Sequence, residues 1–151
     1  MSAQLGNITF DCVDALVLGT FWSHVLGIAL DDGGSAGYCS IGRGDVNRTK
    51  PAWFFEKVPE SKTSKNRVHL DLIDSDEGAV QRIVMLGATI VAEHAVEGGD
   101  HQWTVLRDPE GNEFCVSSTT LGESLLLDHA TALSRSRTLS TQHDRGVGVT
   151  A

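Results

Sequence analysis

Apolar and polar residues alternate along several short stretches of the chain, and apolar residues recur at helical spacing between them. The period-two alternation over residues 8–13 predicts a strand with one buried face. Asp14 can cap a following helix, and Gly27 can end it. The apolar positions of this helix are Leu18, Phe21, Trp22, Val25 and Leu26. Three more strands are expected, over residues 28–30, 38–41 and 52–58.

The same order of elements returns in the second half of the chain. Residues 68–73 alternate as a strand, and Val68, Leu70 and Leu72 are expected to pack under the helices. Asp74 and Glu77 have the spacing of a capping box for a helix that ends at Gly87. Three further strands are expected, over residues 89–92, 102–107 and 112–117, the last two joined by a tight turn at 108–111.

A shift of sixty residues superimposes the two halves without a gap. The matching positions are Asp11 with Asp71, Asp14 with Asp74, Leu26-Gly27 with Leu86-Gly87, and Phe54 with Phe114. We therefore predict an α+β protein made of two βαβββ modules, at about 7–58 and 67–118, within one domain of residues 1–118. Residues 119–151 form a C-terminal extension, in which 121–133 make a helix or belong to a tail that is polar from residue 134.

The charge and cysteine content narrow the classes of protein that fit. The formal charge is −8 and the pI is about 5.1, so the chain offers no broad basic face for nucleic acid. No apolar run is long enough to cross a membrane, and the N-terminal residues lack the basic and apolar pattern of a signal peptide, so we expect neither membrane insertion nor secretion. Three widely spaced cysteines indicate reduced thiols rather than disulfides. We expect a cytoplasmic protein.

Several motifs resemble the vicinal-oxygen-chelate superfamily, and in particular its glyoxalase-like and bleomycin-resistance-like proteins. The segments are residues 11–14, 21–27 and 57–67, with residues 67–72 opening the second module and 108–114 closing it. The resemblance covers about residues 7–117. It implies two modules that form a curved mixed sheet around a cleft, with the helices outside, and it implies a homodimer, with exchange of modules between chains as one arrangement.

Relatives in this superfamily hold a divalent metal with ligands from the first and last strands of each module. The resemblance places His69 at one of these positions. The equivalent residue of the first module is Asn7 or Thr9, the carboxylate near the end of its last strand falls at Phe55 or Glu56, and Cys115 takes the place of the final Glu. We therefore assign no cofactor from the sequence and expect an incomplete form of the usual metal site, with a bound divalent metal as the alternative.

The strongest candidates for chemistry are His69, Asp71 and Asp11. Strand periodicity turns His69 and Asp71 to the same face, which the resemblance makes the cleft. They are either a structural hydrogen-bonded pair or a group that contacts the substrate and transfers a proton. Asp11 is the repeat partner of Asp71 and has the same two interpretations.

The candidates for ligand binding are aromatic side chains and one polar pair. Trp53, Phe55 and Trp103 either form an aromatic wall of the cleft or pack in the core. Glu113 and Cys115 share a strand face and either contact the ligand or join His69 in an improvised metal site. Cys115 is either a nucleophile or a small buried residue.

These residues predict a protein that binds a small organic molecule in the cleft. One hypothesis is a metal-independent enzyme that uses His69, Asp71 and Asp11. A second is a binder that sequesters its ligand, as resistance proteins do. The third is a metal-dependent lyase, isomerase or dioxygenase.

Overall fold

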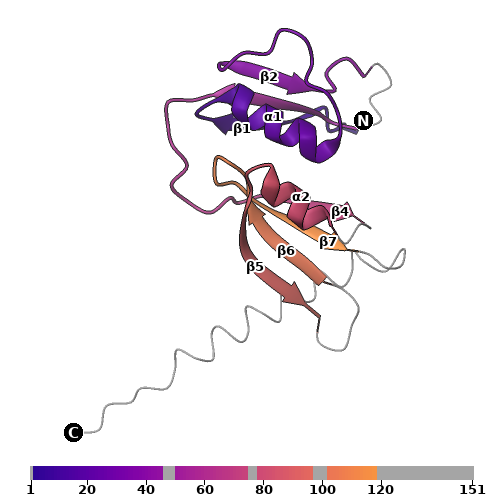
Figure 1. Ribbon diagram of the computed structural model, residues 1–151. Helices are drawn as coiled ribbons and strands as arrows, with labels where there is room; N and C mark the ends of the chain where they lie inside the picture. The colour runs from indigo at the N-terminus through magenta and orange to yellow at the C-terminus, as the bar shows by residue number, and fades with distance from the viewer. Residues whose placement is uncertain (1, 46–49, 75–77, 97–101, 119–151) are drawn as a thin grey trace, which may run out of the picture.

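The computed structural model describes residues 2–45, 50–74, 78–96 and 102–118. It contains two modules that follow each other along the chain (Figure 1). The first comprises β1 (Asn7–Cys12), α1 (Ala15–Leu26), β2 (Tyr38–Ile41) and β3 (Ala52–Lys57). The second comprises β4 (Leu70–Asp74), α2 (Ala79–Met85), β5 (Thr89–Ala95), β6 (Gln102–Arg107) and β7 (Glu113–Ser118).

The two sheets share one topology. Their strand orders are β1-β3-β2 and β4-β7-β6-β5, and in each sheet the first strand lies at an edge, parallel to the last. This confirms the predicted α+β class and the repeated module. The expected strand over 28–30 is reduced to an isolated bridge between Leu30 and Ile41, whereas β5 extends beyond its predicted end to Ala95.

The pairing of the strands corrects the sixty-residue repeat in one place. Phe10 and Leu70 are sixty residues apart and correspond to each other in the two modules. Phe10 pairs with Phe55, and Leu70 pairs with Phe114. Phe55 is therefore the structural counterpart of Phe114, whereas Phe54 points to the opposite face of the sheet, because successive residues of a strand alternate between faces. In the last strand of the module the repeat is thus 59 residues.

The predicted ends of α1 are confirmed. The Asp14 carboxylate accepts hydrogen bonds from the N–H groups of Leu16 and Val17, and Gly27 adopts a left-handed conformation with φ of 66°. For α2 the N-cap is Gly78, without a side-chain hydrogen bond. The proposed capping partner Glu77 lies outside the described residues, as does the predicted helix at 121–133.

One hydrophobic core joins the two modules. Trp22 of α1 is fully buried and contacts Phe114 of β7, with ring centroids 4.9 Å apart. Leu70 and Leu72 pack against this core as predicted. The prediction for Val68 is wrong, because this residue precedes β4 and is 78% exposed.

A polar contact fixes the second module against the start of α1. The Asp108 carboxylate organises the β6–β7 turn by accepting hydrogen bonds from the backbone of Glu110 and Asn112, and it also accepts one from the Trp22 indole at 3.2 Å. Burial raises the pKa of Asp108 in spite of these bonds. The Glu110 carboxylate accepts hydrogen bonds from the N–H groups of Val13 and Asp14. The turn therefore sets the spacing between β1 and the second module.

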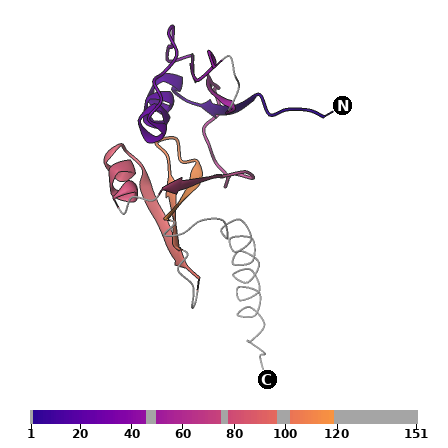
Figure 2. The same ribbon diagram turned by 90° about the vertical axis from the view of Figure 1, so that its right-hand side faces the viewer.

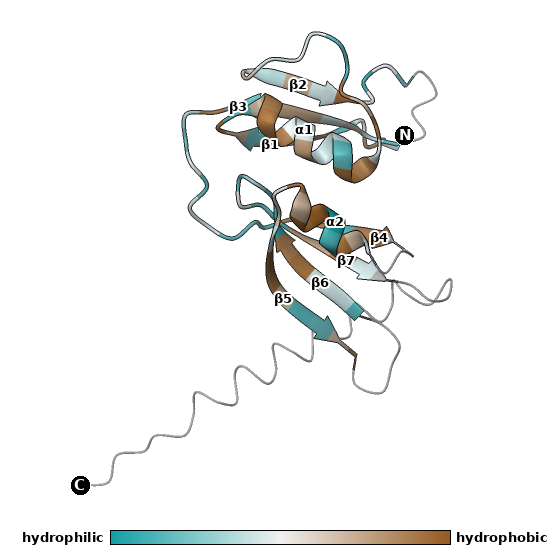
Figure 3. Cartoon of the chain, viewed as in Figure 1, coloured by the Kyte–Doolittle hydropathy of each residue, from teal (hydrophilic) through white to brown (hydrophobic). Residues whose placement is uncertain are grey.

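The two sides of the sheets are covered differently. Figure 2 shows both helices on one side and the connection between the modules on the other. Hydrophobic and hydrophilic residues are interspersed along α1 and α2 (Figure 3), as expected for helices with one buried face. Among the described helices, none has the length and apolar character that a membrane crossing requires.

Candidate functional site

A cleft of about 250 Å³ lies between the edge strand β1 and the second module. Thr9 and Asp11 line it from β1, and His69 and Glu113 line it from the second module. The apolar part of its wall is formed by Ile8, Phe10, Trp22, Val68, Leu70 and Phe114. The cleft therefore combines an apolar base with polar groups contributed by both modules, which is the usual composition of a small-molecule site.

Three side chains of the second module converge, and one of them, His69, lines the cleft. The Nδ1 atom of His69 lies 3.2 Å from the Asp71 carboxylate and 4.0 Å from the Cys115 sulfur. One ligand atom from each residue lies within 4.8 Å of the other two. The convergence follows from the sheet, because Asp71 pairs with Cys115 in neighbouring strands and His69 lies two positions earlier on the same face.

Cys115 has the properties of a buried neutral thiol. Its side chain is 5% exposed. Burial raises the pKa of Cys115 to about 12, and the nearby Asp71 carboxylate adds to the rise. The positive charge of Lys65 opposes part of this rise. At neutral pH the thiol is protonated, which does not favour a role as nucleophile unless a metal or base removes the proton.

Glu113 is held away from the converging group by its own partners. Its buried carboxylate accepts the backbone N–H of Asn66 and pairs with Lys62 at 3.2 Å and with Arg107 at 3.5 Å. Burial by itself raises the pKa of Glu113, but the Asn66 N–H and the Lys62 ammonium together lower it to about 2. The structure thus brings His69 and Cys115 together with Asp71, whereas the improvised metal site was expected to contain Glu113.

The predicted aromatic wall is placed differently. Phe55 is fully buried, and it and Trp53 stack against Phe10 on the side of the sheet that faces α1. Neither lines the cleft. Trp103 lies on the same sheet face as Ser117. Its ring stacks on that of His94, with the ring centroids 5.0 Å apart. The aromatic residue of β3 that points to the helix-free face is Phe54, which contacts Tyr38.

The strand register shows which residues of the two modules correspond to each other. Asp11 pairs with Glu56 as Asp71 pairs with Cys115, so Glu56 is the counterpart of Cys115. Thr9 stands two residues before Asp11, as His69 stands before Asp71, and is the counterpart of His69. Thr9, Glu56, His69 and Cys115 are therefore the equivalent positions of the two modules, and the resemblance to the superfamily led us to expect metal ligands at such positions.

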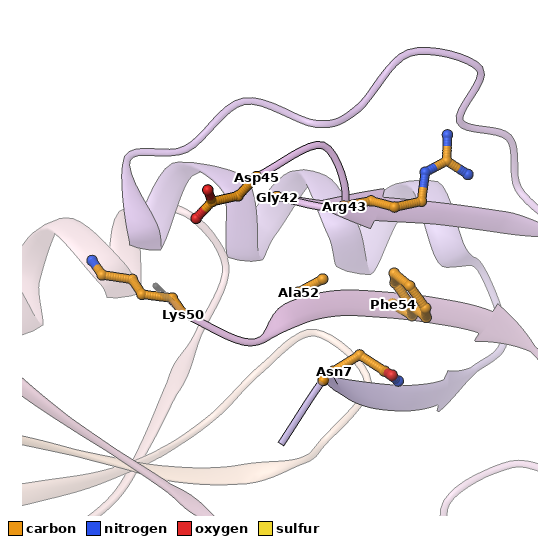
Figure 4. A pocket seen from close by; sticks show the side chains of 8 residues that line it. Asn7, Gly42, Arg43, Asp45, Lys50, Ala52 and Phe54 are labelled. Carbon is orange, nitrogen blue, oxygen red and sulfur yellow. The ribbon is translucent and has the colours of Figure 1, made fainter. Parts of the chain in front are cut away.

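Basic residues near the site were not singled out by sequence reasoning. A cavity of about 520 Å³ is lined by Lys62 and Lys65 of the connection between modules and by Arg107 of β6. Arg107 lies far from Lys62 and Lys65 in the sequence. The basic character of residues 57–67 could have indicated the two lysines, but not Arg107. A smaller pocket of about 110 Å³ contains Arg43 and Lys50, whose head groups point away from each other (Figure 4).

Comparison with known proteins places the chain in a family. The sequence model of the glyoxalase-like domain matches residues 7–117, and the chain therefore belongs to the glyoxalase-like domain family of the vicinal-oxygen-chelate superfamily. This confirms the resemblance drawn from the motifs. No protein with a curated function matches the chain.

Solved structures of this superfamily share the fold. A glyoxalase/bleomycin resistance protein/dioxygenase family enzyme from Burkholderia phytofirmans is 21% identical, with coverage of 77% of this chain and 98% of that one and a TM-score of 0.58. The fosfomycin resistance protein FosX from Mesorhizobium loti is 14% identical, with coverage of 80% and 96% and a TM-score of 0.59. A mutant of FosX from Listeria monocytogenes, in complex with Mn(II) and 1S,2S-dihydroxypropylphosphonic acid, is 15% identical, with coverage of 80% and 94% and a TM-score of 0.62.

The donor set on the described residues differs from the usual one of this superfamily. Threonine and cysteine occupy two positions where relatives carry imidazole, amide or carboxylate ligands. The converging His69, Asp71 and Cys115 nevertheless offer nitrogen, oxygen and sulfur, and three protein ligands with an open position fit a catalytic Zn²⁺ ion. The side chains thus fit a divalent metal that accepts a thiolate ligand better than one that requires oxygen ligands only.

Proposed function

We propose that the protein binds a small organic molecule in the cleft between its modules and that His69 transfers a proton to or from this molecule without needing a metal. The observation that carries the proposal is that His69 lines the cleft and has its Nδ1 atom 3.2 Å from the Asp71 carboxylate. A carboxylate beside Nδ1 favours the tautomer that carries its hydrogen there, so Nε2 keeps the lone pair that accepts a proton.

The chemistry that this pair supports is a simple proton transfer. His69 takes a proton from an acidic position of the bound molecule through Nε2, and the resulting imidazolium is stabilised by the Asp71 carboxylate. Returning the proton to another atom of the molecule completes an isomerisation, and returning it to the same atom leaves the molecule unchanged. Asp11, on the opposite wall, can orient a hydroxyl or amine of the ligand.

Carbon-bound hydrogen exchange tests this proposal whatever the overall reaction is. Small carbonyl compounds are first screened for binding by ligand-observed NMR, and those that bind are then incubated with the protein in D₂O. We expect wild-type protein to catalyse exchange of an acidic C–H group. His69→Ala should lower the exchange rate by roughly 100-fold or more while the dissociation constant stays within about threefold.

His24 provides a matched control, because it is an exposed histidine of α1 that does not line the cleft. His24→Ala should exchange the ligand at the wild-type rate. Binding without exchange in the wild type would favour the sequestering function over the enzyme. Equal exchange by wild type and His69→Ala would refute the assigned role of His69.

A metal-dependent enzyme is the second candidate, and the convergence of His69, Asp71 and Cys115 is the observation that favours it. These residues would hold the ion. A bound Zn²⁺ ion would supply a Lewis acid and lower the pKa of a coordinated water molecule. The complex of FosX from Listeria monocytogenes with Mn(II) supports this candidate, because it is a structural neighbour that contains a divalent metal.

Elemental analysis of untagged protein purified without chelator separates the two candidates. The proposed metal-independent function predicts well below one equivalent of any divalent metal in both wild type and His69→Ala. One equivalent in the wild type and in His24→Ala, lost in His69→Ala, would instead establish the metal-dependent candidate. Loss of hydrogen exchange on treatment with chelator would support the same conclusion.

A further inference from the structure

The cavity of about 520 Å³ lies beside the converging group and on the same face of the second sheet. Val105 and Arg107 of β6 form its floor, and residues 62–65 of the connection between modules border it. Val105 pairs with Cys115, which in turn pairs with Asp71. Neighbouring strands are about 4.7–4.9 Å apart, so the cavity begins one to two strands away from His69 and Asp71.

The lining of this cavity carries an excess of positive charge. Lys62, Lys65 and Arg107 contribute three positive charges, and Glu110 and Glu113 contribute two negative ones, which leaves one positive charge. This excess is notable in a chain whose formal charge is −8. Hydroxyl groups of Thr63 and Ser64 add hydrogen-bonding capacity at the same wall.

Both carboxylates of this lining already have partners. Glu113 is paired with Lys62 and Arg107 and accepts the N–H of Asn66. Glu110 accepts the N–H groups at the start of α1. The Lys62 ammonium, besides its pairing with Glu113, donates a hydrogen bond to the backbone carbonyl of Ser64 at 2.8 Å.

Lys65 differs from Lys62 in its surroundings. Among the residues that the structure describes, it forms no ion pair and no hydrogen bond. It nevertheless lines the cavity, and its positive charge acts on the Cys115 thiol of the converging group by lowering the pKa of that thiol. Among the described residues, the Lys65 ammonium has no partner and the Arg107 guanidinium is paired through its Nε atom. Both cations line the cavity and keep donors that can bind an oxyanion.

We propose that this cavity binds the carboxylate of the organic molecule that occupies the cleft, with Lys65 and Arg107 as its receptors. The inference rests on the proposed function, and it names the class of ligand: a small organic acid whose reactive part reaches His69. The single excess positive charge matches a monoanion, and the planar guanidinium of Arg107 matches the two oxygens of a carboxylate.

An NMR titration with two probes of nearly equal shape tests the proposal. Benzoate carries the carboxylate, and benzamide replaces it with a neutral amide. We expect benzoate to shift the amide signals of Lys65, Val105 and Arg107 in ¹⁵N-labelled protein. Benzamide should bind at least about tenfold more weakly, because hydrogen bonds between two charged groups are stronger than those to a neutral amide.

Charge removal at Lys65 provides the decisive comparison. Lys65→Gln should weaken benzoate binding at least about fivefold and leave the melting temperature unchanged, because Lys65 has no partner in the described structure. Lys57→Gln, at an exposed lysine at the end of β3, should bind benzoate as the wild type does. Arg107→Gln should also weaken binding, but it removes a partner of Glu113, so its folding must be checked by its ¹⁵N spectrum.

The outcomes separate this inference from the proposed function. Equal binding of benzoate and benzamide, or of wild type and Lys65→Gln, would overturn the carboxylate site. Inorganic phosphate shifting the same amides when benzoate does not would overturn the assignment to a carboxylate. If benzoate binds as expected but neither it nor larger acids shift the signals of Thr9 and His69, the anion site stands and the proposed function fails.

Discussion

Removal of the Glu110 carboxylate is expected to weaken the contact between the modules. Its Oε1 atom accepts hydrogen bonds from the N–H groups of Val13 and Asp14, at 3.0 Å and 3.1 Å. These residues lie 97 and 96 positions earlier in the chain, so the contact joins the β6–β7 turn directly to the start of α1. Glu110→Ala leaves both donors to water and removes a negative charge from the N-terminus of the helix.

The expected loss of stability can be worked out from these two bonds. A hydrogen bond to a charged group contributes about 1.5–3 kcal/mol when buried, but the Val13 N–H is exposed and the Asp14 N–H is only partly buried. About 1 kcal/mol for each bond is therefore appropriate, and the free energy of unfolding should fall by about 2 kcal/mol. Glu110→Gln keeps a carbonyl oxygen as acceptor and should lose roughly half as much.

Urea unfolding followed by tryptophan fluorescence measures this difference, because Trp22 lies in the core that the two modules share. Glu60→Ala is the control, since Glu60 is an exposed residue of the connection without a hydrogen bond or ion pair among the described residues. If the free energy of unfolding of Glu110→Ala changed by less than about 0.5 kcal/mol, as in the control, the Glu110 contact would not stabilise the fold.

Two further predictions concern the stability of each module. Glu113 should make the stability of the fold depend on pH, because its pKa in the folded protein, about 2, lies below the ordinary value of 4.5. Its contribution to the free energy of unfolding is full above about pH 4.5 and is lost as the pH falls towards 2. Acid unfolding of Glu113→Gln should lack this component, whereas an identical pH profile would contradict it. Gly19→Ala should lower the free energy of unfolding by about 1–3 kcal/mol, because an added Cβ overlaps the Cys39 sulfur. Gly6→Ala is the control, since a Cβ at Gly6 meets open space, and it should leave the free energy of unfolding unchanged in chemical denaturation.

The sequence predicted the elements well where the hydrophobic pattern had a clear period. Alternation defined β1, and Asp14 and Gly27 marked both ends of α1. The β6–β7 turn followed from Asp108 and Gly111, the latter having φ of 85°. These signals are local, so each can be read from a few adjacent residues.

The orientation of β3 could not be predicted in the same way. Trp53, Phe54 and Phe55 are three consecutive aromatic residues, so this stretch has no alternation that reveals the buried face. The pairing of Phe55 with Phe10 decides it, and this places Trp53 and Phe55 in the core and Phe54 on the other face. The register error in the repeat has the same origin.

The site was predictable only in part. The common face of His69 and Asp71 followed from strand periodicity, and the contact of both with Cys115 followed from the pairing of β4 with β7, which sequence alone does not give. The positions of Lys65 and Arg107 depend on how the connection between modules folds across the sheet. Such long-range placement leaves no periodic signal in the sequence.

The most direct test of the central claim is to fill the cleft and measure ligand binding. Thr9 lines the cleft from β1, whereas Thr20 lies exposed on α1 and does not line it, so Thr9→Trp and Thr20→Trp form a matched pair. In ¹⁵N NMR titrations with a small organic acid that binds the wild type, we expect Thr9→Trp to bind at least about tenfold more weakly and Thr20→Trp to bind with unchanged affinity. Wild-type affinity in a folded Thr9→Trp protein would show that the cleft is not the ligand site.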